Sequence, residues 1–93
     1  MRAVHVIVSG RVHGVGFRAW TAEEAQSLRV TGWVRNLRDR TVEAVFCGSE
    51  AAVDEMVDRV GVGPLGARVE NVLVSDWDGG KFDAFAILST QSA

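Results

Sequence analysis

The sequence predicts an α+β fold in which two helices pack on one face of an antiparallel sheet of four to five strands. Several short segments alternate apolar and other residues, which is typical of strands with one face in a core. Two other segments carry apolar residues at the spacing of a helix. The chain has 93 residues, of which 47% are hydrophobic, and this is enough for one packed core. We therefore expect residues 1–93 to form a single domain.

The predicted elements begin with a strand, a glycine-rich loop and a helix. The strand is expected over about residues 4–9, because its three valines alternate with other residues and share one face. The glycine-rich loop occupies residues 10–16. Thr21 and Glu24 then form a T-x-x-E capping box, in which the two side chains bond backbone N–H groups at the start of a helix. We therefore expect the first helix to begin at Thr21.

The rest of the chain continues with two strands, a second helix and two more strands. Four apolar residues at positions i, i+3, i+4 and i+7 predict the second helix, with Ser49 as its N-cap: Val53, Met56, Val57 and Val60. The strands are expected at residues 31–37, 41–47, 68–77 and 85–88, separated by turns and loops. This order of strands and helices is the split βαβ, or ferredoxin-like, pattern. Because the pattern hosts many functions, function must be argued from a site.

Charge is distributed unevenly along the chain. The net charge of −2 gives no general attraction to nucleic acid or to an anionic membrane, so neither is expected as a partner. Residues 1–42 contain seven Arg and three acidic residues, a balance of +4, whereas residues 43–93 contain three basic and nine acidic residues, a balance of −6. Positive charge gathered in one half predicts an anion site there, although scattered surface arginines would have the same composition.

Cysteine, histidine and apolar content together predict a cytoplasmic protein without a cofactor. Cys47 is the only cysteine, so the sequence permits no internal disulfide. The N-terminus lacks the pattern of a signal peptide, and no apolar stretch approaches the roughly 18 residues that a membrane span requires. His5 and His13 have no matching carboxylate or cysteine arrangement, so no metal is expected. Nothing in the sequence requires a partner subunit, and a monomer is expected.

The glycine-rich loop and the arginine after it have the composition of a phosphate-binding site. Gly10, Gly14 and Gly16 lack a Cβ atom, so their backbone can approach a ligand closely and adopt positive φ angles. Backbone N–H groups in such a loop can converge on an anion, and the following helix adds its positive N-terminal end. Arg18 is always charged and can bind two phosphate oxygens at once. A tight connection between strand and helix would also need glycines, so this segment alone does not decide between the two interpretations.

Two longer motifs favour the phosphate-binding interpretation. Residues 8–18, VSGRVHGVGFR, resemble the first signature of the acylphosphatase family. Residues 32–36, GWVRN, followed by TVEA at residues 41–44, are similar to the second signature of that family. The two motifs have the order and separation of the family, and the resemblance extends over nearly the whole chain. It implies a single acylphosphatase-like domain over residues 1–93, with a ferredoxin-like fold.

The resemblance implies an enzyme that hydrolyses small acyl phosphates, such as acetyl phosphate, without a metal ion. Arg18 would bind the phosphate of the substrate, and Asn36 would position the attacking water. Seven residues of the loop would surround the same phosphate with backbone N–H groups: Arg11, Val12, His13, Gly14, Val15, Gly16 and Phe17. A carboxylate leaving group needs no proton, so charge stabilisation and positioning are enough for catalysis.

Two positions bear on how closely the chain follows the family pattern. Many members have Gln where this chain has His13, but His is a common variant there, and its side chain could hydrogen-bond within the loop. The family favours Gly where this chain has Arg40. An arginine at positive φ would cost roughly 1 kcal/mol, or the hairpin turn would have to differ from that of the family.

Two other classes of function fit the same fold. A phosphate-binding or regulatory module would use the loop without catalysis. An RNA-binding domain would share the order of strands and helices, but the third strand here has one aromatic residue, Phe46, where RNA-recognition domains have several. Hydrolysis of acyl phosphates is therefore the leading interpretation. We interpret the tryptophans, His5, Ser9 and Cys47 as structural residues.

Overall fold

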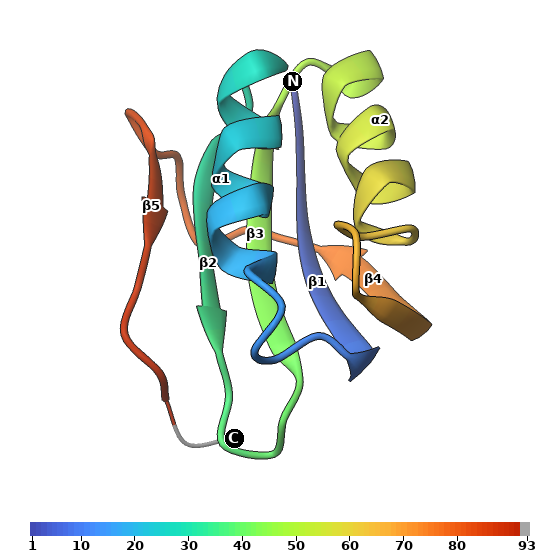
Figure 1. Ribbon diagram of the computed structural model, residues 1–93. Coiled ribbons are helices and arrows are strands. Elements are labelled where there is room, and N and C mark those ends of the chain that lie inside the picture. Colours follow the sequence, from blue (N-terminus) through green and yellow to red (C-terminus); the bar gives the residue numbers. More distant parts are fainter. Residues whose placement is uncertain (92–93) are drawn as a thin grey trace.

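The computed structural model describes residues 1–91, which form five strands and two helices. Figure 1 shows both helices on the same face of the sheet. This arrangement confirms the predicted ferredoxin-like α+β fold. In chain order the elements are β1 (Arg2–Arg11), α1 (Phe17–Ser27), β2 (Thr31–Asn36), β3 (Val42–Gly48), α2 (Glu50–Val60), β4 (Arg68–Asp76) and β5 (Phe85–Ile87).

The strand order in the sheet is β4-β1-β3-β2-β5. The pairs β1–β3, β1–β4 and β2–β3 are antiparallel, as predicted, but β5 pairs with β2 in parallel. The prediction of a wholly antiparallel sheet is therefore wrong for the last strand. Because β4 and β5 lie at opposite edges, the segment between them crosses the sheet instead of making a hairpin, and Figure 1 shows it passing behind the strands. The turn expected at residues 78–80 is part of this crossing.

The crossing segment packs on the face of the sheet that the helices leave open. Trp77 stacks on His5 of β1 at a ring-centroid distance of 6.2 Å, and it meets Trp33 of β2 edge-on at 6.3 Å. On the same face, Glu43 of β3 accepts hydrogen bonds from His5 Nε2 at 2.7 Å and from Arg35 Nε at 2.6 Å. Burial alone would raise the pKa of Glu43, but the hydrogen bonds from His5 and Arg35, together with their charges, lower it overall.

The main core lies between the sheet and the helices. The three valines of the first strand are all 0% exposed, which confirms the predicted alternation: Val4, Val6 and Val8. Three residues of the apolar stripe of α2 belong to the same cluster: Val53, Met56 and Val60. The fourth, Val57, is partly buried and packs against it. Ser49 caps α2 as predicted, because its hydroxyl oxygen accepts a hydrogen bond from the backbone N–H of Ala52 at 3.2 Å.

Helix α1 begins at Phe17, earlier than the predicted start at Thr21. Thr21 is fully buried within the helix, and its hydroxyl donates a hydrogen bond to the carbonyl of Phe17 at 2.7 Å. The predicted capping box is therefore wrong. The residue before the helix is Gly16, which has φ 73°, and no side chain caps the first turn. The loop thus runs directly into the helix, and the first backbone N–H groups are left available to a ligand.

The β2–β3 hairpin follows Asn36, the last residue of β2. It is closed by a hydrogen bond from Leu37 N to Thr41 O at 3.0 Å. The Asp39 carboxylate accepts hydrogen bonds from the hydroxyl and the backbone N–H of Thr41, and these bonds lower the pKa of Asp39. Arg40 has φ 75°. Of the two alternatives for this position, an arginine at positive φ is therefore confirmed.

Candidate active site

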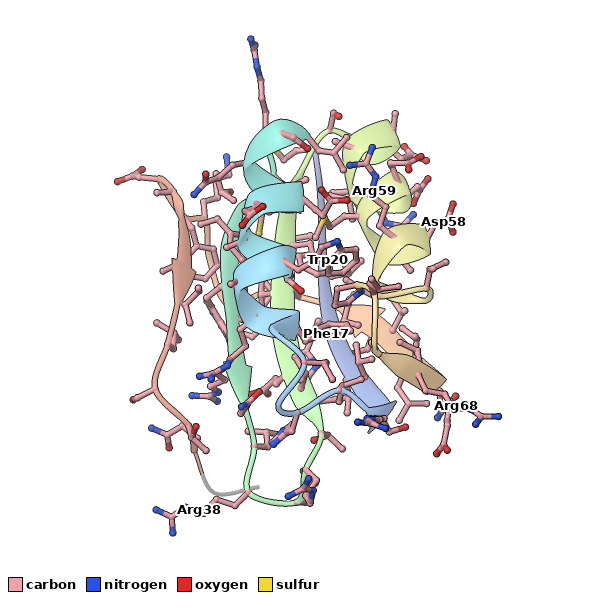
Figure 2. The ribbon with its side chains drawn as sticks, in the orientation of Figure 1. Phe17, Trp20, Arg38, Asp58, Arg59 and Arg68 are labelled. Atoms are coloured by element: carbon pink, nitrogen blue, oxygen red, sulfur yellow. The ribbon has the colours of Figure 1, made fainter. Side chains whose placement is uncertain are left out.

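A cavity of about 270 Å³ lies between the β1–α1 loop, the end of β2 and β5. It brings together Arg18 and Asn36, the two residues predicted to bind the phosphate and to position the water. Eight residues line it: Val12, Gly14, Gly16, Phe17, Arg18, Ala19, Asn36 and Ile87. Figure 2 shows Phe17 at the base of α1, where the loop enters the helix.

Three predicted loop residues do not line the cavity. Arg11 is exposed at the end of β1, where its cross-strand partner is Arg68 of the edge strand β4. Figure 2 shows the Arg68 side chain extending outward from this edge. Val15 is half-buried and packs against the core. The side chain of His13 reaches the hairpin, where Nε2 donates a hydrogen bond to Thr41 O at 2.8 Å, so its partner lies outside the loop.

The loop leaves part of its backbone open to the cavity. Gly14 has φ 71° and Gly16 has φ 73°. A residue with a Cβ atom adopts this left-handed region at a cost of roughly 1–2 kcal/mol. A Cβ atom added at either position would meet no heavy atom within 4 Å, so the space beside both is open to a ligand. Gly10 has another role, because a Cβ atom there would clash with the carbonyl oxygen of Arg68 on β4.

The electrostatics at the start of α1 favour an anion. The first turn has neither a side-chain cap nor an acidic residue, so nothing there neutralises the positive end of the helix. Arg18 is the second residue of α1 and is half-buried. It forms no salt bridge with any residue in the described range 1–91. The guanidinium and the helix end therefore both contribute positive charge at one cavity.

Asn36 contributes a buried acceptor to the cavity. Its Oδ1 atom is buried and accepts no hydrogen bond from the residues that the structure describes. A buried polar atom without a partner costs about 1–3 kcal/mol, so such atoms are rare and call for an explanation. Because Asn36 lines the same cavity as Arg18, a water molecule held there could donate a hydrogen bond to this oxygen.

Two residues of the cavity are absent from the predicted set, Ala19 and Ile87. Ala19 follows Arg18 in the helix, so its proximity could have been inferred from the motif. Ile87 belongs to β5 and is 49% exposed. Its place depends on the parallel pairing of β5 with β2, in which Ile87 lies opposite Val34. No local pattern in the sequence indicates that pairing.

A larger cavity, of about 470 Å³, lies between the two helices. Figure 2 shows Trp20 and Arg59 in this gap, with Asp58 on α2. Its lining has one basic residue, Arg59, and three acidic ones, and this excess of negative charge opposes the binding of a phosphate: Glu24, Glu55 and Asp58. None of the predicted site residues lines it. The smaller cavity is therefore the better candidate for an anion site.

Three further features bear on the kind of site. Among residues 1–91, no group of three or more His, Cys, Asp or Glu side chains is arranged to hold a metal ion. Within the same described range, no helix is long and apolar enough to cross a membrane. Cys47 is buried in β3, and burial raises the pKa of its thiol, which disfavours the thiolate that a nucleophile requires.

A family model, curated relatives and solved structures connect this chain with acylphosphatases. The acylphosphatase family model matches residues 4–87. An acylphosphatase from Rhodopseudomonas palustris is 56% identical over 68 residues, which are 73% of this chain and 69% of that protein. One from Rhizobium etli is 53% identical over 70 residues, which are 75% of this chain and 74% of that protein. The crystal structure of acylphosphatase from Bacillus subtilis superposes with a TM-score of 0.90 at 34% identity, covering 95% of this chain and 99% of that one. With its fold, its two motifs and these relatives in agreement, the chain belongs to the acylphosphatase family.

Proposed function

We propose that this acylphosphatase hydrolyses small acyl phosphates by attack of an Asn36-oriented water on a phosphate group held by Arg18 and the loop. Membership of the family supports the activity itself. The observation that carries the detailed mechanism is the cavity of about 270 Å³ that both side chains line together with Gly14 and Gly16. We further propose that residues 1–93 act as one metal-independent domain, as a cytoplasmic monomer.

The phosphate group of the substrate would lie against the loop and the start of α1. There, the backbone N–H groups of the first helical turn carry no side-chain cap. A dianion is the ligand that such a positive helix end and a converging loop favour. Arg18 forms no salt bridge with a carboxylate among the described residues. Its guanidinium N–H groups can therefore donate hydrogen bonds to two phosphate oxygens.

The reaction needs no acid for the leaving group. The water oxygen forms a bond to phosphorus while the bond from phosphorus to the carboxyl oxygen breaks, and the electron pair leaves with a stable carboxylate. The proton of the water passes to a phosphate oxygen. The transition state spreads negative charge over the three equatorial oxygens of the phosphoryl group. Arg18 and the loop N–H groups stabilise that charge, and such preorganised donors are worth several kcal/mol in a partly enclosed site.

Asn36 would supply orientation rather than charge. Its buried, unpartnered Oδ1 accepts a hydrogen bond from the attacking water, and this fixes one lone pair of the water toward phosphorus. Holding a nucleophile in the productive direction lowers the barrier by removing rotational and translational freedom beforehand. The side chain is neutral, so it does not compete with the phosphate for Arg18.

The proposal is tested by measuring phosphate release from acetyl phosphate with excess chelator present. The wild-type chain should be active under these conditions. Arg18→Ala should lower kcat/KM by at least about 100-fold, the effect of removing one donor to a charged transition state. Arg29→Ala is the matched control, because Arg29 is exposed and follows the opposite end of α1.

The outcomes separate the competing functions. Arg29→Ala should stay within about twofold of wild type, since this charge is remote from the cavity. Activity that disappears with the chelator would identify a metal-dependent phosphatase. A wild-type chain that binds phosphate without releasing it from acyl phosphates would identify a binding module. An Arg18→Ala variant within a few-fold of wild type would contradict the proposed phosphate site.

A further inference from the structure

The two halves of the proposed site belong to different parts of the chain. The phosphate loop follows β1, whereas Asn36 ends β2. The ladder between β1 and β3 ends at the pair Val8 and Val42, and β1 continues to Arg11 along β4 alone. The loop after β1 and the hairpin before β3 are therefore not joined by strand pairing.

One side chain connects them. His13 Nε2 lies 2.8 Å from the carbonyl oxygen of Thr41, a residue 28 positions later. Because a carbonyl oxygen only accepts, Nε2 carries the proton of this hydrogen bond. Among the described residues, no other hydrogen bond joins the segment 11–17 to the segment 37–41. The imidazole of His13 thus provides the hydrogen-bonded link between the two segments.

The carbonyl that receives this bond is itself well fixed. It also accepts the hydrogen bond from Leu37 N at 3.0 Å, and Leu37 is the residue directly after Asn36. The N–H and hydroxyl of Thr41 are both bonded to the carboxylate of Asp39. A movement of the loop relative to this carbonyl would therefore change the distance between the phosphate cradle and Asn36.

We propose that His13 is a positioning residue, which through its hydrogen bond to Thr41 sets the distance between the phosphate loop and the water-orienting amide of Asn36. This inference rests on the proposed function, because it concerns the geometry of the same reaction. Both the neutral Nε2–H imidazole and the imidazolium donate this bond, so the role requires no change of protonation. The imidazole of His13 need not contact the substrate, because this role is separate from that of the backbone N–H groups of the loop.

Variants that differ only in reach and donor capacity test the proposal. His13→Gln keeps an N–H donor near the position of Nε2, whereas His13→Asn keeps the same amide on a side chain that is one methylene shorter. His13→Asn and His13→Ala should lower kcat about 10- to 100-fold, the range expected when a reacting group is misplaced by up to about 1 Å. His13→Gln should stay within about threefold of wild type. The inhibition constant for inorganic phosphate should change less than about threefold in all of them, since phosphate binds the loop and Arg18 alone.

A double-mutant cycle separates positioning from general support of the fold. Asn36→Ala should itself lower kcat, and in that background His13→Asn should have less than about a twofold further effect, because no oriented water remains to be misplaced. Equal losses in both backgrounds, or a His13→Asn variant as active as His13→Gln, would overturn the inference. If Asn36→Ala leaves kcat unchanged, the water-orienting role fails, and the inference fails with it. A loss of kcat with Asn36→Ala but not with His13→Asn would refute the inference alone. Thermal midpoints of every variant identify any loss of the fold.

Discussion

Arg40, like Arg29, has a positive φ angle that costs stability, and glycine at position 40 should recover that stability. The residue has φ 75° in the β2–β3 hairpin and is exposed. An L-residue with a Cβ atom adopts the left-handed region at a cost of roughly 1–2 kcal/mol. Glycine escapes that cost but loses about 0.5–1 kcal/mol more conformational entropy on folding. The difference between these two ranges is about 0–1.5 kcal/mol, so Arg40→Gly should raise the free energy of unfolding by roughly 0.75 kcal/mol.

The matched control is Arg38→Gly. Arg38 lies in the same turn, is also exposed and carries the same charge, but its φ is not positive. The Arg38→Gly variant should therefore have a free energy of unfolding about 0.5–1 kcal/mol lower than wild type, which is the ordinary entropic cost of glycine. Thermal and urea unfolding of both variants measure the difference, and for a domain of 60–100 residues a stabilisation of 1 kcal/mol raises Tm by about 4–8 °C. If Arg40→Gly is no more stable than Arg38→Gly, strain at Arg40 is not the dominant effect.

Two further predictions concern the open face of the sheet and the mouth of the cavity. Glu43→Gln should lower the stability at pH 7 by about 1–3 kcal/mol, because the half-buried acceptor of Arg35 and His5 loses its charge. The pKa of Glu43 is lowered in the folded state, so its contribution is complete above its ordinary value of about 4.5 and is lost as the pH falls through the folded value. Urea unfolding of both proteins from pH 7 to pH 3 should therefore show the two stability curves converging below about pH 4.5, and a constant difference would contradict the assignment. Ile87→Ala should lower kcat/KM for benzoyl phosphate about three- to tenfold more than for acetyl phosphate, because Ile87 forms an apolar wall of the cavity. Equal effects on the two substrates would show that this wall does not contact the acyl group.

Features that depend on residues close together in the sequence were predicted well. The alternating valines of β1 lie in the core, and Ser49 caps α2. In both cases one periodicity or one side chain is enough to determine the local structure. Thr21 shows the limit of this reasoning, since its motif resembles a cap although it lies inside a helix. That helix instead begins after Gly16, which has φ 73°, and no side chain caps its first turn.

Features that depend on tertiary placement were predicted less well. The parallel pairing of β5 follows from a crossing between opposite edges of the sheet, and only this crossing brings Ile87 to the cavity. The bond from His13 to Thr41 likewise joins segments with no shared pattern. For the candidate site, glycine spacing and charge made the loop and Arg18 candidates, and the two longer motifs were needed to favour phosphate binding over a tight strand-to-helix connection. Asn36 could be proposed only through the resemblance to the family, because a strand-ending asparagine has no chemical signal of its own.

The two helices show where the fold favours stability and where it favours binding. α2 has a Ser49 cap, the acidic Glu50 in its first turn and the basic Arg59 in its last turn, all of which suit its dipole. α1 has no side-chain cap and places Arg18 next to its positive end, an arrangement that costs about 0.3–1 kcal/mol for the charge alone. Both helices pack against the same buried core, so packing does not explain the contrast. A bound dianion does explain it, since it would neutralise Arg18 and cap the free N–H groups at once. The uncompensated positive charge at the start of α1 is therefore the arrangement that the proposed phosphate site requires.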